Sequence, residues 1–124
     1  IKPGVSDQPT AQWDFLATAC DLAGGKAPAT DGGSITPTLL GKKGQRTAPY
    51  QYWEFHEQGG WKALRQGNLK LIYFVKPARY ELYDLAADPG ERTDLAAQRP
   101  TDMARLKSVL NGARTPSEAF PLLN

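Results

Sequence analysis

Residues 50–85 decide the fold of this chain, and they read YQYWEFHEQGGWKALRQGNLKLIYFVKPARYELYDL. Aromatic and aliphatic residues are dense here and alternate with polar ones at the period of two that is typical of strands. Glycine, asparagine and proline interrupt the pattern three times, which favours tight turns. The sequence therefore predicts a small four-stranded antiparallel sheet, with strands over residues 50–56, 61–66, 69–75 and 80–85.

Both faces of the predicted sheet carry apolar side chains. In the third strand, Leu71 and Tyr73 on one face alternate with Ile72 and Phe74 on the other. An antiparallel sheet with one solvated face keeps that face polar. We therefore expect each face of this sheet to be covered by something.

A C-terminal helix is predicted to cover one face. It follows Pro100, takes Thr101 as its N-terminal cap and ends near Gly112. Its apolar residues recur at helical spacing and form one stripe: Met103, Leu106, Val109 and Leu110. The other face would be covered by the N-terminal piece or by protein outside this chain.

The N-terminal piece is predicted to be helical. Apolar residues at helical spacing indicate a helix over residues 11–23, and a short apolar segment over 35–40 indicates a single turn. Residues 42–49 are polar and unpatterned, as in an exposed connector. We expect an α+β chain with two parts, residues 1–41 and residues 42–124.

Composition excludes several classes of protein. Of the 124 residues, 40% are hydrophobic and 23% are charged, and the mean hydropathy is −0.50, as in a folded globular protein. The longest bulky apolar run, Leu71–Val75, is far shorter than the roughly 20 residues that a spanning helix needs, so no membrane insertion is expected. One Cys and one His exclude a disulfide framework and a Cys/His zinc site within this chain. Because the chain begins with Ile1, we expect it to be a piece of a longer protein.

Positive charge is concentrated in the middle of the chain. Residues 41–80 contain eight Lys or Arg residues and only two Glu residues. Such a stretch could hold an anionic partner, or it could be an ordinary solvated surface. The isoelectric point near 8.7 lies below the value of about 9 that is typical of nucleic-acid-binding domains, so no nucleic-acid partner is expected.

The strand around residue 54 contains the candidate binding residues. Alternation places Glu54 and His56 on one face, where the carboxylate could orient the imidazole as a donor for an anionic ligand. Arg65, on the next strand, could face the same side and add a guanidinium suited to oxyanions. The alternative is that His56 is an ordinary surface residue. A thiol–imidazole pair of His56 with Cys20 is rejected, because Cys20 lies in the apolar stripe of a predicted helix.

An ordered series of short motifs resembles the C-terminal region of the arylsulfatase-type sulfatases, which depend on formylglycine and belong to the alkaline phosphatase superfamily. The strand motifs are Tyr50–Glu57, Gly59-Gly60, Ala63-Leu64-Arg65, Gly67–Leu71 and Glu81–Leu85, followed by Asp88–Glu91 and Asp94–Ala96. The N-terminal motifs are Ile1–Gly4, Asp14–Thr18, Asp31-Gly32 and Leu39-Leu40-Gly41. The resemblance extends from Ile1 to about Arg114, with Ala17 in place of a usual proline and Leu69 in place of a usual tryptophan.

The resemblance implies that residues 1–41 are the last helical segment of an α/β catalytic domain and that the sheet is a C-terminal subdomain. The parent protein would hydrolyse sulfate monoesters, with a sulfated small molecule or glycan as its substrate. In the family, C-terminal loops often line the mouth of the substrate pocket. That role is carried over to His56 first, and to Glu54, Glu57 and Arg65 as further substrate-binding candidates.

The family's nucleophile and metal are expected to lie outside this chain. The nucleophile is a formylglycine made from a Cys or Ser followed by x-Pro-x-Arg, whereas Cys20 is followed by Asp21-Leu22-Ala23-Gly24. The divalent cation, usually calcium, is held by residues of the catalytic domain. We therefore expect no catalytic residue, no metal ligand and no turnover in this chain alone. Members of the family are mostly periplasmic, lysosomal or secreted, so the resemblance implies such a location for the parent protein.

Two other functions stay open at this point. The chain could be a noncatalytic module that binds sulfated glycans, or the tail of a related phosphodiesterase or phosphonate hydrolase. Separated from the missing catalytic domain, a sheet with an apolar face is also expected to self-associate.

Overall fold

The computed structural model describes residues 1–121. The chain divides between Ala48 and Pro49 into two compact units. The predicted α+β class is confirmed, with helical segments in the first unit and a sheet with one helix in the second. The assignment of residues 1–41 to a catalytic domain stays a prediction.

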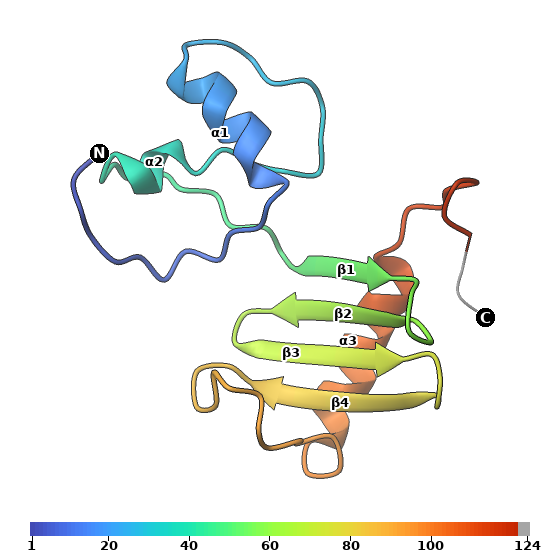
Figure 1. Ribbon diagram of the computed structural model, residues 1–124. Coiled ribbons are helices and arrows are strands. Elements are labelled where there is room, and N and C mark those ends of the chain that lie inside the picture. The colour runs from blue at the N-terminus through green and yellow to red at the C-terminus, as the bar shows by residue number, and fades with distance from the viewer. Residues whose placement is uncertain (122–124) are drawn as a thin grey trace. The chain divides into compact units, whose positions relative to one another are not determined.

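The second unit contains the predicted antiparallel sheet, whose strands follow one another in the order β1-β2-β3-β4 (Figure 1). Gln66 and Leu69 are paired across the two-residue turn Gly67-Asn68, and Gly67 has a φ of +60°. Glycine adopts this left-handed conformation without steric cost. The strands are β1 (Gln51–Phe55), β2 (Trp61–Gln66), β3 (Leu69–Phe74) and β4 (Arg79–Asp84).

Helix α3 (Pro100–Gly112) covers one face of this sheet (Figure 1). Leu64, Leu71 and Leu82 are partners across three neighbouring strands, and all three are fully buried. Burying such side chains stabilises the fold by roughly 1.5–3 kcal/mol each. The helix contributes the expected stripe to the same core, through Met103, Leu106 and Leu110, with Val109 packed beside them.

The expected N-terminal cap of α3 is wrong. The helix begins at Pro100, its capping position is Arg99, and no side chain caps it. Proline fits the first helical position because the N–H that it lacks has no partner within the helix. Thr101 therefore lies inside the first turn and is exposed.

The opposite face of the sheet carries a second set of half-buried apolar side chains. Phe55 stacks on Trp61 with ring centroids 5.5 Å apart, and the Arg79 guanidinium lies 4.5 Å from the centroid of Phe74. Within the described residues of this unit, α3 is the only helix, so this face has no helical cover. The expectations that another body of protein covers it, and that the chain self-associates, stay predictions.

The first unit is built around two short helices, α1 (Asp14–Leu22) and α2 (Thr36–Leu39). Helix α1 begins at Asp14, later than predicted, because the Asp14 side chain holds the backbone around the first turn. Its carboxylate accepts hydrogen bonds from the N–H groups of Ala11 at 2.8 Å and Gly33 at 3.0 Å. Thr18 Oγ1 accepts a hydrogen bond from the N–H of Ile35 at 3.0 Å. These bonds tie the loop before α2 to α1.

Candidate functional site

Glu54 and His56 lie side by side at the end of β1, on the face of the sheet that α3 covers. The register pairs Tyr52 with the buried Leu64, so Tyr52 and Glu54 share that face. His56 Nε2 lies 3.2 Å from Glu54 Oε1, which is the pairing expected from the two-residue spacing.

The strand ends just before His56 because the chain then turns sharply. Gln58, Gly59 and Gly60 have φ values of 53°, 87° and 77°, and Gly60 N–H donates to the carbonyl of Glu57 at 2.9 Å. Three successive left-handed residues are incompatible with a continued strand. His56 is thereby held at the rim of the sheet, with 28% of its side chain exposed.

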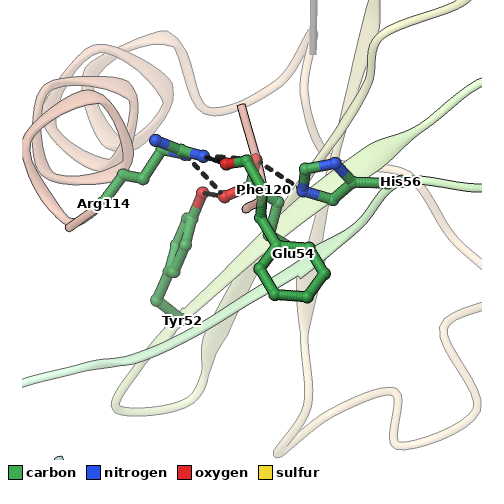
Figure 2. Close-up of polar contacts among 5 residues, drawn as sticks. All are labelled: Tyr52, Glu54, His56, Arg114 and Phe120. Carbon is green, nitrogen blue, oxygen red and sulfur yellow. Dashed lines mark hydrogen bonds and ion pairs between the residues drawn. The ribbon is translucent and has the colours of Figure 1, made fainter. Parts of the chain in front are cut away.

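Arg114 and Tyr52 complete a cluster around the Glu54 carboxylate (Figure 2). Arg114 Nε donates to Oε1 at 3.3 Å and to Oε2 at 3.0 Å, and the Tyr52 hydroxyl donates to Oε2 at 2.9 Å. The Glu54 and Arg114 side chains are each only 13% exposed. Solvent screens such a pair less than it screens a surface ion pair.

The electrostatics of the cluster keep Tyr52 protonated. Burial raises the pKa of the Tyr52 hydroxyl well above its usual range, and the hydrogen bond to the Glu54 carboxylate raises it further. Tyr52 therefore remains a hydrogen-bond donor to Glu54 at any physiological pH.

The segment after α3 also reaches His56. The Phe120 ring meets the imidazole edge-on, with centroids 5.9 Å apart and planes at 74°. Arg114 Nη2 donates a hydrogen bond to the Phe120 carbonyl oxygen. Arg114 thus links the segment after α3 to β1.

The remaining two candidates do not join this cluster. Glu57 is exposed in the turn after β1. Arg65 pairs with Gln51 in the register, which places it on the opposite face of the sheet, and its Nε donates to the carbonyl of Gly67 at 3.1 Å. The expectation that Arg65 shares a face with Glu54 and His56 is therefore wrong. The role of each candidate in binding substrate stays a prediction.

Sequence reasoning missed Arg114 as a member of the site and assigned no role to Tyr52. Tyr52 lies on the same face as Glu54, as the period of two along the strand requires, but its hydroxyl partner depends on side-chain geometry. Arg114 lies 60 residues from Glu54 and beyond the end of α3. Its basic character next to the end of a predicted helix was the only available signal.

The described residues offer no metal centre. Among residues 1–121, no three His, Cys, Asp or Glu side chains lie close enough together to hold a metal ion. Cys20 is a free, half-buried thiol on α1. None of the helices in the described part of the chain is long and apolar enough to cross a membrane.

A family model matches almost the whole chain. The model describes the C-terminal region of N-sulphoglucosamine sulphohydrolase, and it matches residues 1–114. The matched range includes the first unit and the second unit as far as Arg114, and so it contains Tyr52, Glu54, His56 and Arg114.

Characterised relatives with similar sequences are sulfatases. Delta 4,5-hexuronate-2-O-sulfatase of Bacteroides thetaiotaomicron is 39% identical in an alignment of 95 positions, which covers 72% of this chain and 19% of the relative. Choline-sulfatase of Rhizobium meliloti is 33% identical in an alignment of 128 positions, which covers 97% of this chain and 25% of the relative. The chain thus spans about a fifth to a quarter of the length of these relatives.

Solved structures give the same result. A 2-O GAG sulfatase superposes with a TM-score of 0.72 at 33% identity, covering 81% of this chain and 23% of that one. The phosphonate monoester hydrolase of Agrobacterium radiobacter has a TM-score of 0.60 at 23% identity, over 96% of this chain and 30% of that one, which shows a shared fold only. With the family model matched over residues 1–114, the chain belongs to the sulfatase family and corresponds to its C-terminal region.

Proposed function

We propose that this chain is the C-terminal part of an enzyme that hydrolyses sulfate monoesters, and that it helps to bind substrate without cleaving the bond itself. The observation that carries the proposal is the family match over residues 1–114. Its extent fits a part of an enzyme, because the chain spans 19% and 25% of two sulfatases that it resembles.

The calcium ion and formylglycine expected from the family do not fit the residues present. No acidic cluster for a cation exists among residues 1–121, and Cys20 is not followed by x-Pro-x-Arg. Both groups would have to come from the remaining part of the parent protein.

His56 is the residue that we place against the substrate. Its ring is partly exposed at the rim of the sheet, and Glu54 holds one ring nitrogen, so the other nitrogen is available. Such a nitrogen accepts a hydrogen bond from a hydroxyl when neutral and donates one to a sulfuryl oxygen when protonated. Glu57 remains a candidate at the same rim, and Arg65 would act only from the opposite face.

A sulfated saccharide is the first substrate class to test. One relative is a hexuronate-2-O-sulfatase, and a protein of similar structure was solved with its substrate D-glucosamine-2-N,6-O-disulfate, at 26% identity and a TM-score of 0.67. Saccharides present hydroxyl groups that the imidazole nitrogen can bind. Choline sulfate is the small, non-saccharide substrate to test beside it, because a second relative is a choline-sulfatase.

The test is sulfate release by the protein encoded by the complete open reading frame that includes this chain. We expect release from at least one member of a panel of sulfated saccharides, choline sulfate and an aryl sulfate. The 124-residue chain alone is the control, and it should release none. Hydrolysis of a phosphonate monoester without any sulfate release would contradict the proposal, as would turnover by the chain alone.

The complete open reading frame also distinguishes a noncatalytic role from the proposed one. If the reading frame encodes little protein beyond these residues, and if its product hydrolyses no ester, the sulfatase proposal is wrong. Calorimetric titration of the chain with sulfated oligosaccharides would then test whether it is a glycan-binding module.

A further inference from the structure

We propose that Arg114 is a positioning residue: together with Tyr52 it fixes the Glu54 carboxylate, and Glu54 in turn holds His56 so that only its Nδ1 is presented to a ligand. The sulfated nature of that ligand rests on the proposed function, but the arrangement of the four side chains does not. In this proposal Glu54 orients His56 and does not itself contact the substrate.

Most of the hydrogen-bonding capacity of Glu54 is already used within the cluster. The Oε1 atom accepts a hydrogen bond from Arg114 Nε at 3.3 Å and lies 3.2 Å from His56 Nε2. The Oε2 atom accepts hydrogen bonds from Arg114 Nε at 3.0 Å and from the Tyr52 hydroxyl at 2.9 Å. A carboxylate offers about four lone-pair sites in total. Three donors share these sites, because the single Nε–H of Arg114 contacts both oxygens, so a ligand donor at Glu54 would have to compete with them.

The charges at the site also argue against a direct contact between Glu54 and an anionic substrate. A bare carboxylate beside an anionic ester would repel it, because Coulomb energy between like charges grows as solvent is excluded. Arg114 supplies the compensating positive charge at a site where both side chains are only 13% exposed. With Arg114 in place, the pair is neutral and the His56 ring is left as the polar group at the rim.

The contact with Glu54 also fixes which ring nitrogen carries a proton. His56 Nε2 lies 3.2 Å from Glu54 Oε1, and an ionised carboxylate only accepts hydrogen bonds, so a hydrogen bond between these two atoms requires the proton on Nε2. In the neutral ring, Nδ1 then bears the free lone pair. Phe120 packs edge-on against the same ring, which further limits its rotation (Figure 2).

The chain allows a direct spectroscopic test because His56 is its only histidine. In nitrogen-15 spectra of the 124-residue protein, we expect one downfield ring N–H signal at Nε2 that is protected from exchange with water. Arg114→Met should speed the exchange of this proton by about tenfold, the loss expected for one charge-assisted hydrogen bond. Arg114→Lys should restore part of the protection, because it keeps the charge without the fork of donors.

A matched control separates positioning from a general effect on folding. Arg105 lies on α3, which precedes Arg114 in the chain; its side chain is about half exposed, and it contacts Gln66 and Asp102 and not Glu54. Arg105→Met should leave the Nε2–H signal unchanged. Should Arg114→Met unfold, Tyr52→Phe removes one donor to Glu54 with little change in volume, and it should also speed exchange.

An unchanged Nε2–H signal in folded Arg114→Met or Tyr52→Phe would overturn the proposal, and so would a protected N–H at Nδ1. Failure of the positioning role can be distinguished from failure of the proposed function, because the spectroscopic result does not depend on turnover. In the protein from the complete reading frame, Arg114→Met should raise KM more than it lowers kcat. Sulfate release with an unchanged KM would contradict the positioning role alone.

Discussion

Arg114 Nε donates to both carboxylate oxygens of Glu54, at 3.3 and 3.0 Å, although the two residues are 60 positions apart in the sequence. The contact joins the segment after α3 to β1. It therefore contributes to stability as well as to the arrangement of the candidate site.

The Glu54–Arg114 pair is expected to be energetically coupled. Arg114→Met should lower the free energy of unfolding by roughly 1–3 kcal/mol, because it leaves a largely buried carboxylate without its charged partner. A double-mutant cycle with Glu54→Gln, measured by urea denaturation, should give a coupling energy of at least about 1 kcal/mol.

The control for this cycle is the exposed pair Asp102–Arg105, whose side chains are 33% and 47% exposed. Its coupling should not exceed about 0.5 kcal/mol. Equal coupling energies in the two cycles would show that Glu54–Arg114 behaves as an ordinary surface pair.

Leu106 is the central contact of α3 with the sheet and is fully buried. Leu106→Ala should destabilise the second unit by about 2–5 kcal/mol, since it removes buried methyl groups and leaves a cavity. Ser108→Ala, on the exposed side of the same helix, should change stability by less than about 0.5 kcal/mol. Thermal unfolding followed by circular dichroism measures both, and similar melting temperatures for the two variants would contradict the packing described.

High pH should destabilise the sheet through its buried tyrosines. Burial, and then the hydrogen bond to Glu81, raises the pKa of Tyr83 from 10.0 to about 12. Because the folded-state pKa is above the unfolded one, this contribution is fully present below pH 10 and is lost as the pH rises to about 12. The loss is on the order of 2 kcal/mol.

Tyr83→Phe isolates this effect. The variant should show a shallower fall in the free energy of unfolding between pH 10 and 12 than the parent chain, since it has no hydroxyl to ionise at this position. Some slope should remain, because burial also raises the pKa of Tyr52 and Tyr80. Identical pH profiles would show that Tyr83 ionises as it does in the unfolded chain.

Gly32 allows a close backbone approach in the first unit. A Cβ at this position would lie 1.9 Å from the carbonyl oxygen of Trp13, so Gly32→Ala forces the backbone to move. We expect faster amide hydrogen exchange in α1, with a cost of about 1–3 kcal/mol. Gly33→Ala is the matched control, since a Cβ there meets nothing within 4 Å. Equal protection of α1 in the two variants would contradict this account.

The strands were predictable from sequence because alternation and turn residues act over a few neighbouring positions. All four fall within one or two residues of their expected bounds, and the Gly67-Asn68 turn fixes the register of β2 with β3. The start of α1 was misplaced because Asp14 is bonded to Gly33, a contact that spans a loop.

The site was only partly predictable for the same physical reason. Alternation within one strand was enough to bring Glu54 and His56 together. The side on which Arg65 lies depends on the register between β1 and β2, which the longer turn over residues 57–60 leaves open. The contact of Arg114 with Glu54 depends on where α3 ends relative to β1, and no local pattern encodes that distance.

The rate of sulfate release by the protein from the complete reading frame, with His56 intact or replaced in His56→Ala, tests the central claim most directly. We predict measurable release from a sulfated saccharide or choline sulfate, and a rise in KM of about tenfold in His56→Ala, the loss of one hydrogen bond to the substrate. Release with the same KM in both proteins would remove His56 from the substrate site. No release from any sulfate ester would contradict the assignment of this chain to a sulfate-hydrolysing enzyme.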